Sequence, residues 1–242
     1  MERLRAQARM EIMLTLRAGE GVLISIVVPA VLLVFFASIG LAPSGYKKHP
    51  MEFILPGMVA LAVMSVGLVS LSIRTAYERS YGVLKRLGST PLTRLELLAA
   101  KIVSVILVEL VGIAILVAIA AFGYGWRPTG AFGLAILALV LGTIVFSAIG
   151  LLLAGALRAE TTLAAANGLY LLFLLLGGIV YPVDQLPGPV AVPARALPSS
   201  AFSDALRATL AHNAAYPWTN LIVLALWGIA AMIVASRTFQ WE

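Results

Sequence analysis

The chain has 242 residues, of which 61% are hydrophobic and 12% are charged, with a net charge of +6 and a mean hydropathy of +1.01. A soluble domain is about half apolar and a quarter charged, so this chain lacks the polar residues to cover a soluble globule. A soluble enzyme, a disordered protein and a disulfide scaffold are therefore excluded. The absence of cysteine also excludes thiolate metal sites.

Six apolar runs along the chain are long enough to cross a membrane, which takes about 20 residues in a helix. They cover residues 21–41, 52–73, 101–122, 131–155, 163–182 and 217–236. We therefore predict an all-α integral membrane protein with six transmembrane helices, built as a single domain over residues 1–242. An even number of spans places both termini on the same side of the membrane.

Lysine and arginine are distributed unequally between the segments that connect these runs. One set of segments holds 12 of the 17: Arg3, Arg5, Arg9, Arg17, Arg74, Arg79, Lys85, Arg86, Arg94, Lys101, Arg158 and Arg237. The other set holds the remaining 5: Lys47, Lys48, Arg127, Arg195 and Arg207. Cytoplasmic segments carry the excess of Lys and Arg. We therefore predict a multi-pass protein of the cell membrane with both termini in the cytoplasm.

The segment before the first span, residues 1–20, is rich in arginine. Apolar residues recur in it at four-residue spacing: Leu4, Ala8, Ile12 and Leu16. This spacing predicts an amphipathic helix that lies in the inner membrane interface. Because Arg5 and Arg9 flank the apolar stripe, a solvated basic leader is the alternative.

Residues 74–100 form the longest predicted cytoplasmic connection, with the sequence RTAYERSYGVLKRLGSTPLTRLELLAA. Charges of alternating sign with apolar residues between them predict a short helix exposed to water on one side. We expect Gly88 to end this helix and a proline at Val83 to break it. Such a helix beneath a membrane domain has the form of a docking surface; a solvated loop that obeys the positive-inside rule is the alternative.

The next residues predict how the chain enters the third span. Thr90-Pro91 makes a turn, because a helix cannot run through a proline. Thr93 and Glu96 have the spacing of a capping box, in which each side chain hydrogen-bonds to the backbone of the other residue. The sequence therefore predicts a helix start at this point.

Residues 183–216 form the longest predicted external connection, and they contain four prolines followed by a short helical run. Phe202, Leu206 and Leu210 recur at helical spacing and share one face. Together with Pro182 at its start, the segment is rich in apolar residues. We predict short re-entrant helices between spans five and six that cap the outer mouth of the protein, where other parts of the protein satisfy the backbone.

Signatures of enzyme chemistry are absent from the sequence. It has no G-x-x-x-x-G-K-[ST] phosphate loop and no G-x-S-x-G elbow. The two histidines, His49 and His212, are too few for a metal site. Ser203, Asp204 and His212 are the residue types of a hydrolytic Ser-His-Asp set, but a capped helix with polar loop residues explains them without catalysis. We expect no catalytic residue, metal or cofactor in this chain.

A few polar residues fall within the predicted spans. Glu109 lies eight residues after Lys101, which places it about 12 Å into the bilayer at 1.5 Å per residue. An ionisable group at that depth costs about 2.5–3.5 kcal/mol to insert, so it marks either a pathway or a paired site, with Ser147 as the predicted partner. Asn167 and Tyr170 on span five are the other candidates for a translocation path, with interhelical hydrogen bonding as the alternative.

These features resemble the pattern of ABC-2-type transporter permeases over essentially the whole chain. The first intracellular loop of that family carries E-R-E-x-G-T-L-x-x-L-x-x-T-P-x-x-x-x-E-L-x-x-x-K. The matching positions here are Glu78, Arg79, Gly82, Leu84, Leu87, Thr90, Pro91, Glu96, Leu97 and Lys101. Asn167 with GLYLLFLLLGGIVYPVDQLP after it, and SDALRA at 203–208, resemble the stretches around the family's outer loop. Ser80 replaces the family's second acidic residue, and Glu109 belongs to no family motif.

The resemblance implies a permease that works as a dimer of identical or paralogous copies, each on a separately encoded ATPase that binds ATP and Mg. It implies a coupling helix at about 78–88 and export of a drug, lipid or glycan carrier. The residues it assigns to ATPase coupling are Glu78, Arg79, Tyr81, Gly82, Leu84, Lys85, Arg86, Leu87 and Pro91. Two other functions stay open: an ion-coupled secondary transporter that uses Glu109, and a membrane scaffold or assembly factor that transports nothing.

Overall fold

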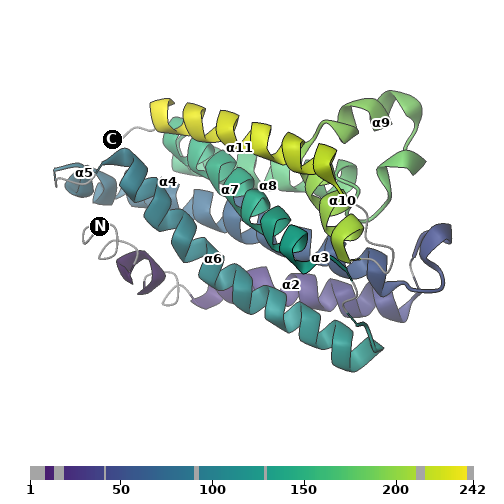
Figure 1. Ribbon diagram of the computed structural model, residues 1–242. Coiled ribbons are helices and arrows are strands. Elements are labelled where there is room, and N and C mark those ends of the chain that lie inside the picture. Colours follow the sequence, from purple (N-terminus) through teal and green to yellow (C-terminus); the bar gives the residue numbers. More distant parts are fainter. Residues whose placement is uncertain are drawn as a thin grey trace.

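The computed structural model of the protein describes residues 9–13, 19–40, 42–89, 93–127, 130–210 and 216–238. Every regular element in these ranges is helical, and the long helices lie along one another in an elongated bundle (Figure 1). The elements are α2 (Gly19–Ser38), η1 (Ser44–Tyr46), α3 (Met51–Met64), η2 (Ser65–Ser70), α4 (Leu71–Ser80), α5 (Val83–Gly88), α6 (Arg94–Ala118), η3 (Ile119–Gly123), α7 (Phe132–Ala156), α8 (Ala159–Leu176), η4 (Val183–Gln185), α9 (Gly188–Arg195), α10 (Pro198–Leu210) and α11 (Trp218–Thr238). The predicted all-α class is confirmed for the described residues.

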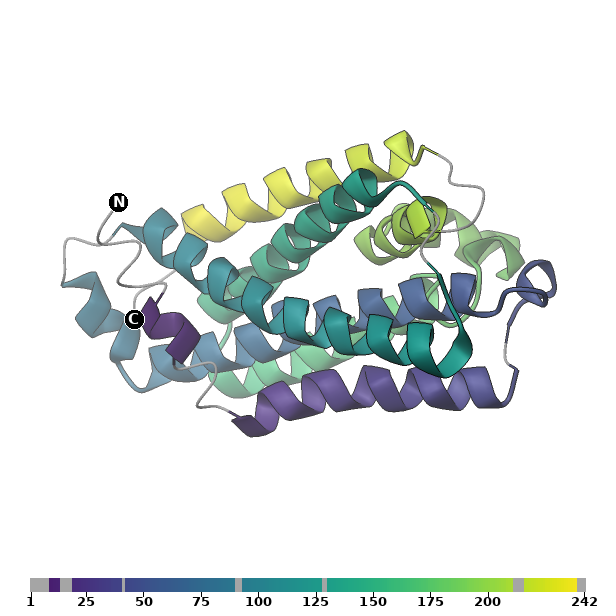
Figure 2. The ribbon, with the colours of Figure 1, turned by 60° about the horizontal axis from the view of Figure 1, so that its bottom comes forward.

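The bundle has two different ends. One end, here called the α5 end, carries α5, the helical turn at residues 9–13 and the last turns of α11 (Figure 2). The other, the α10 end, carries α9 and α10 (Figure 1). The long helices run between these two ends in alternating directions. The predicted coupling residues within the described ranges therefore lie at the α5 end and the predicted cap residues at the α10 end, with Glu109 between them in the interior.

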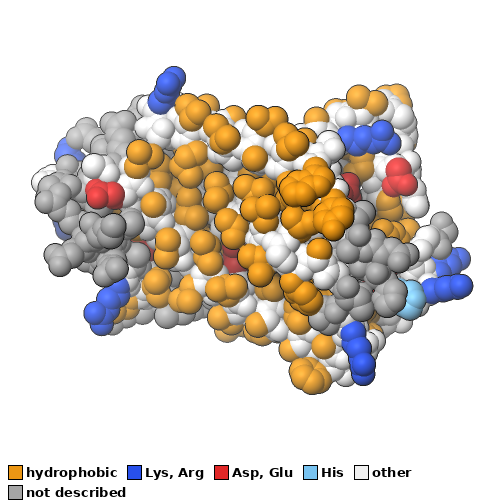
Figure 3. Space-filling view, viewed as in Figure 1, with side chains coloured by type: hydrophobic (Ala, Val, Ile, Leu, Met, Phe, Trp, Pro, Cys, Tyr) orange, Lys and Arg blue, Asp and Glu red, His pale blue; other side chains and the backbone are white. Residues whose placement is uncertain are grey.

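Among the described residues, five helical stretches are long and apolar enough to cross a membrane: Met51–Ser80, Leu95–Gly123, Phe132–Ala156, Ala159–Leu176 and Trp218–Thr238. The apolar part of α2 within the described residues, Leu23–Ser38, is shorter. Figure 3 shows hydrophobic side chains over the middle of one face and Lys and Arg towards the ends. This distribution fits a bundle whose middle faces lipid. The multi-span membrane protein is therefore supported, and the sixth span stays a prediction.

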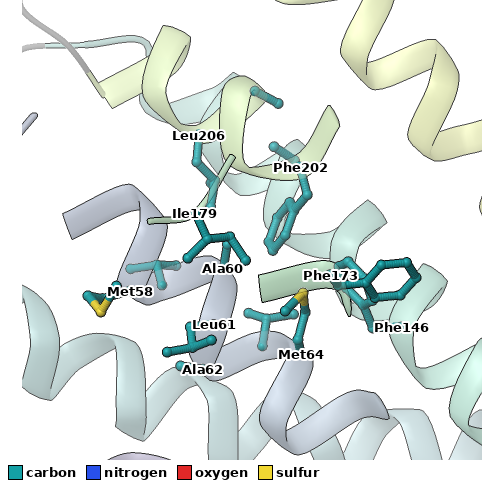
Figure 4. Close-up of a cluster of buried hydrophobic side chains, with 14 of the residues drawn as sticks. Met58, Ala60, Leu61, Ala62, Met64, Phe146, Phe173, Ile179, Phe202 and Leu206 are labelled. Carbon is teal, nitrogen blue, oxygen red and sulfur yellow. The ribbon is translucent and has the colours of Figure 1, made fainter. Parts of the chain in front are cut away.

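The α3 helix lies at the centre of the bundle because it is apolar on every side. Nearly all of its residues are buried, and it packs against α2, α6, α7 and α10. Aromatic rings meet at its end: the Phe146 centroid lies 5.9 Å from that of Phe173 and 5.7 Å from that of Phe202 (Figure 4). The core thus joins α7, α8 and α10 beside the end of α3.

The helix that holds α3 continues without a break through the π-helical segment η2 into α4. The second span was predicted to end at residue 73, but the helix runs to Ser80. Residues 74–80 extend it because their charged side chains find partners inside the protein rather than in water. A π-helical turn in mid-helix occurs frequently at functional sites.

The end of the fifth predicted span also differs from the sequence prediction. The span was expected to reach residue 182, whereas α8 ends at Leu176. Gly178 follows with a φ of +68°, in the left-handed region that favours glycine. The chain leaves the helix at this point and turns towards η4 and α9. The glycine pair at this position therefore ends the helix six residues earlier than the apolar run suggests.

Candidate functional site

The turn between α4 and α5 sets the position of the predicted docking helix. The α4 helix ends at Ser80, and Gly82 adopts a φ of +72°, which allows the chain to leave α4 and start a new helix within two residues. The coupling helix was predicted over 78–88, but α5 starts at Val83. Glu78 belongs to the last turn of α4 instead, because the left-handed glycine separates the two helices.

One face of α5 is buried and the other is exposed. Leu84 is fully buried and packs in a cluster with Leu97 and Leu98 of α6. On the outer side, Lys85 and Arg86 are exposed, and Tyr81 in the turn before α5 is 74% exposed. We call Tyr81, Lys85 and Arg86 the α5 surface.

The connection from α5 to α6 is described only in part. Leu87 is partly buried and packs against the same cluster as Leu84, whereas the predicted site residue Pro91 lies outside the described residues. The predicted capping box is confirmed: the Thr93 hydroxyl accepts from the backbone N–H of Glu96 at 3.2 Å. The Thr93 N–H donates to the Glu96 carboxylate at 2.8 Å. The α6 helix therefore starts where the sequence predicts.

Glu78 and Arg79, which were predicted to contact an ATPase, have internal partners. Arg79 donates to the backbone carbonyls of Gly155 and Leu157, where α7 ends. These are carbonyls that a helix leaves without intrahelical partners. Glu78 pairs with Lys101 of α6. Both residues thus fix the end of α4 within the bundle instead of facing outwards.

Lys101 is the centre of a charged cluster that the sequence does not reveal. Its side chain is 0% exposed, and its Nζ atom also lies 3.0 Å from Glu11 Oε1. Arg74 contacts Glu11 at 3.5 Å and Glu78 at 3.7 Å. Glu11 is one of three acidic residues in the basic segment 1–20, and nothing in its spacing marks it for this role. Most of the predicted interfacial helix at 1–20 lies outside the described residues.

Glu109 lies in the interior, 4% exposed, where α6 meets α7 and η2. The Thr143 hydroxyl donates to one of its carboxylate oxygens. The predicted partner was Ser147, one helical turn further along α7. Within the described residues, neither the other Glu109 oxygen nor the Ser147 hydroxyl has a hydrogen-bond partner, and both atoms lie close to Gly67. The structure thus places Glu109 in a buried polar cluster, as the pairing alternative expects.

The other two predicted pathway residues lie elsewhere, on α8. Asn167 is exposed and its side-chain amide donates to the Leu163 carbonyl at 2.8 Å in its own helix. Tyr170 is partly buried and packs against the core cluster. The structure does not bring Asn167 and Tyr170 together with Glu109 into a single site.

The predicted external cap corresponds to η4, α9 and α10. Phe202 and Leu206 are fully buried, Leu210 is partly buried, and α10 packs against α3, α7 and α11. Pro182 is partly exposed at the start of the segment. The three apolar residues of α10 therefore point into the bundle, because they share one helical face.

Arg207 holds this segment in place, a role that the sequence does not show. It is 6% exposed and donates to the carbonyls of Gly178 and Ile179, in the turn after α8. Its guanidinium lies 4.1 Å from the centre of the Phe53 ring and 3.1 Å from Asp204. Burial lowers the pKa of Arg207, and the Asp204 carboxylate opposes that shift.

The residues of the imagined hydrolytic set have other partners. The Ser203 hydroxyl donates to the Gly177 carbonyl at 2.7 Å, Asp204 pairs with Arg207, and His212 lies outside the described residues. Among the residues that the structure describes, no three His, Cys, Asp or Glu side chains are grouped so that they could hold a metal ion. Ser203 and Asp204 therefore have structural roles in the segment after α8.

An apolar groove of about 660 Å³ runs between α2 and α6 on the outside of the bundle. Its lining comes from Ile26, Val27, Ala30, Val31, Val34, Phe35, Ser38, Ile115 and Ile119. The hydroxyls of Ser38 and Tyr124 lie 3.5 Å apart at one end of it. The groove is thus lined by apolar residues apart from Ser38, whose hydroxyl lies next to that of Tyr124 at the α10 end.

Comparison with known proteins finds a matching family and similar proteins in other organisms. The sequence model described as "ABC-2 type transporter" matches residues 2–211. The putative transport permease YvfS of Bacillus subtilis (strain 168) is 25% identical over 98% of this chain and 96% of its own length. The probable multidrug ABC transporter permease YbhS of Escherichia coli (strain K12) is 26% identical over 68% of this chain, which corresponds to 44% of the length of YbhS.

Proposed function

Because the chain belongs to the ABC-2 type transporter family, it is a membrane permease, and we propose that it exports a hydrophobic or amphipathic substrate from the cytoplasm, driven by ATP. A separate ATPase subunit binds and hydrolyses the ATP with Mg, since this chain has no phosphate loop. The working unit contains two permeases, identical or paralogous, and two ATPases in the cell membrane. Drugs, lipids and glycan carriers are the candidate cargo, as the resemblance implies.

The observation that carries this proposal is the α5 surface. Lys85 and Arg86 are exposed on the six-residue helix α5 and Tyr81 is exposed two residues before its start, while Leu84 is buried on the other side of α5. The exposed side of α5 can bind a partner, while its buried side packs against α6 and its start is joined to α4. A movement of the partner would therefore displace α4 and α6 together with α5. The basic side chains favour a partner surface that carries carboxylates.

The apolar groove between α2 and α6 supports the class of cargo. Its walls are aliphatic and aromatic, so an acyl chain or an apolar drug would bury its surface there. The hydroxyls of Ser38 and Tyr124 offer partners for a polar head. An amphipathic molecule matches both features.

The two alternatives predict different behaviour. An ion-coupled transporter needs an accessible carrier, but Glu109 is 4% exposed and accepts a hydrogen bond from Thr143. A scaffold would form a complex without moving any substrate. Transport that requires ATP hydrolysis by a copurifying subunit separates the proposed function from both.

The test is copurification of an ATPase with the tagged permease from native membranes. We expect the ATPase with the wild-type chain and at least a tenfold loss with the double variant Lys85→Glu/Arg86→Glu. The matched control is Lys47→Glu/Lys48→Glu, a pair of adjacent exposed lysines at the opposite end of the bundle. Absence of an ATPase from the wild-type preparation would contradict the proposed function. An equal yield from both double variants would contradict the role of the α5 surface.

A further inference from the structure

Four charged side chains form a closed ring at the α5 end, here called the ion ring: Glu11, Arg74, Glu78 and Lys101. Each carboxylate contacts both cations through different oxygens. Lys101 Nζ lies 3.0 Å from Glu11 Oε1 and pairs with Glu78 Oε2. Arg74 lies 3.5 Å from Glu11 Oε2 and 3.7 Å from Glu78 Oε1. Positive and negative groups therefore alternate around the ring, and the four formal charges cancel.

Within the ion ring, Glu11 from the N-terminal segment and its partner Lys101 are the most buried members. The side chains of Lys101 and Glu11 are 0% and 2% exposed, compared with 15% for Glu78 and 20% for Arg74. An ammonium group without water around it depends on its carboxylate partners, so removal of one partner leaves a buried charge without compensation. Contact between Glu11 and Lys101 is therefore strongly favoured over separation.

The ion ring connects three parts of the chain. Glu11 belongs to the helical turn at residues 9–13, Arg74 and Glu78 belong to α4, and Lys101 belongs to α6. These elements lie together at the end of the bundle that carries α5 (Figure 2). Because the chain passes from Glu78 into α5 within five residues, the position of α5 depends on the ring.

We propose that Glu11 is a positioning residue for the α5 surface, holding the N-terminal segment to α4 and α6 through the ion ring. This inference rests on the proposed function, in which α5 receives the movement of the ATPase. The ring makes α5, the end of α4 and the N-terminal segment move as one unit. Without Glu11, α5 still binds the ATPase, but its movement is no longer shared with the N-terminal segment.

The test measures the distance between the N-terminal segment and α5 by pulsed electron paramagnetic resonance. Because the chain has no cysteine, spin labels attach only at the introduced pair Met10→Cys and Ser89→Cys, both exposed positions. In the full-length permease in lipid nanodiscs we expect one narrow distance distribution. Glu11→Gln should widen it at least twofold. Arg9→Gln, a neutralised exposed neighbour, is the matched control and should leave the width unchanged.

A second variant guards against misfolding caused by an unbalanced buried charge. Glu11→Gln/Arg74→Gln removes one charge of each sign and retains the pair of Lys101 with Glu78. We expect it to widen the distribution as Glu11→Gln does. A wild-type width in this double variant would overturn the positioning role of Glu11.

The second readout uses the complex with its ATPase. In Glu11→Gln we expect the wild-type yield of copurified ATPase. The permease changes the rate of ATP hydrolysis by its ATPase, and we expect this change to be at least threefold smaller in the variant. Wild-type hydrolysis in this variant would overturn the inference. If the wild-type permease captures no ATPase, the proposed function fails, whereas the distance measurement still decides whether Glu11 positions α5.

Discussion

A Cβ atom on Gly150 would lie 2.6 Å from the carbonyl oxygen of Gly67 and 2.9 Å from that of Leu68. The contact is reciprocal, since a Cβ atom on Gly67 would lie 3.1 Å from the hydroxyl oxygen of Ser147. The backbones of η2 and α7 therefore approach each other where both lack side chains, as small residues permit in membrane proteins. This crossing lies beside Glu109, so it also shapes the buried polar cluster.

The first prediction is that Gly150→Ala destabilises the protein by about 1–3 kcal/mol, because the added methyl group meets backbone atoms that cannot move aside. Gly168→Ala is the matched control. Gly168 lies within α8 with open space around it, and alanine favours a helix over glycine by about 1 kcal/mol. Thermal unfolding of the two variants in detergent checks this, and equal midpoints would argue against the close crossing.

The second prediction concerns Glu109 and Thr143. A double-mutant cycle with Glu109→Leu and Thr143→Val should give a coupling energy of about 0.6–2 kcal/mol, the range for hydrogen bonds between membrane helices. Unfolding free energies of the wild type, the two single variants and the double variant provide the measurement. Strictly additive effects would show that the two side chains do not interact.

Glu109→Gln separates a structural role from a role in transport. Glutamine keeps an acceptor oxygen for Thr143 and removes only the ionisable group. If Glu109 is a buried partner, transport per folded molecule should stay at the wild-type level. A selective loss of transport with unchanged stability would place Glu109 on the pathway and revive the ion-coupled alternative.

The third prediction corrects the expected effect of proline on α5. Val83 is the first residue of α5, a position where proline is tolerated, so we now expect Val83→Pro to leave the helix intact, contrary to the expectation from the sequence. Arg86→Pro should break it, because the N–H of Arg86 donates to the Gly82 carbonyl at 3.2 Å. Copurification of the ATPase should fall more in Arg86→Pro than in Arg86→Ala, which loses the same charge, and should persist in Val83→Pro. Equal yields from the proline and alanine variants at residue 86 would argue that the shape of α5 is unimportant.

The fourth prediction is that the α5 end faces the cytoplasm. Ser80 is exposed there and Lys47 is exposed near the other end, so each can carry a single cysteine in the cysteine-free chain. With an impermeant thiol reagent, Lys47→Cys should react in intact cells and Ser80→Cys only in inside-out vesicles. The reverse pattern would invert the predicted topology.

The fifth prediction concerns limited proteolysis of the external segment. Arg195 is exposed at the end of α9, whereas Arg207 is 6% exposed and donates to two carbonyls after α8. Trypsin added from outside should cut after Arg195 well before it cuts after Arg207. Rapid cleavage at both would show that the segment is a mobile loop and would argue against a cap.

Local composition predicts several features of this protein. The long apolar runs specify membrane helices because a buried backbone in lipid must satisfy its own hydrogen bonds. The capping box at Thr93 and Glu96 depends on residues close in the chain, and it is present in the structure. The family resemblance also rests on local motifs, which explains why it is visible without coordinates.

The partners of the polar side chains were decided only by the packing of the helices. Glu78 and Arg79 read as an exposed docking motif, yet they contact α6 and the end of α7. Glu109 is buried with a partner on α7, as its position in an apolar run suggests, but the rotation of α7 presents Thr143 to it instead of Ser147. Each of these pairs joins residues at least 20 positions apart. Hydropathy and periodicity specify which residues form a helix, whereas the facing sides of two helices depend on how their side chains and glycines fit together.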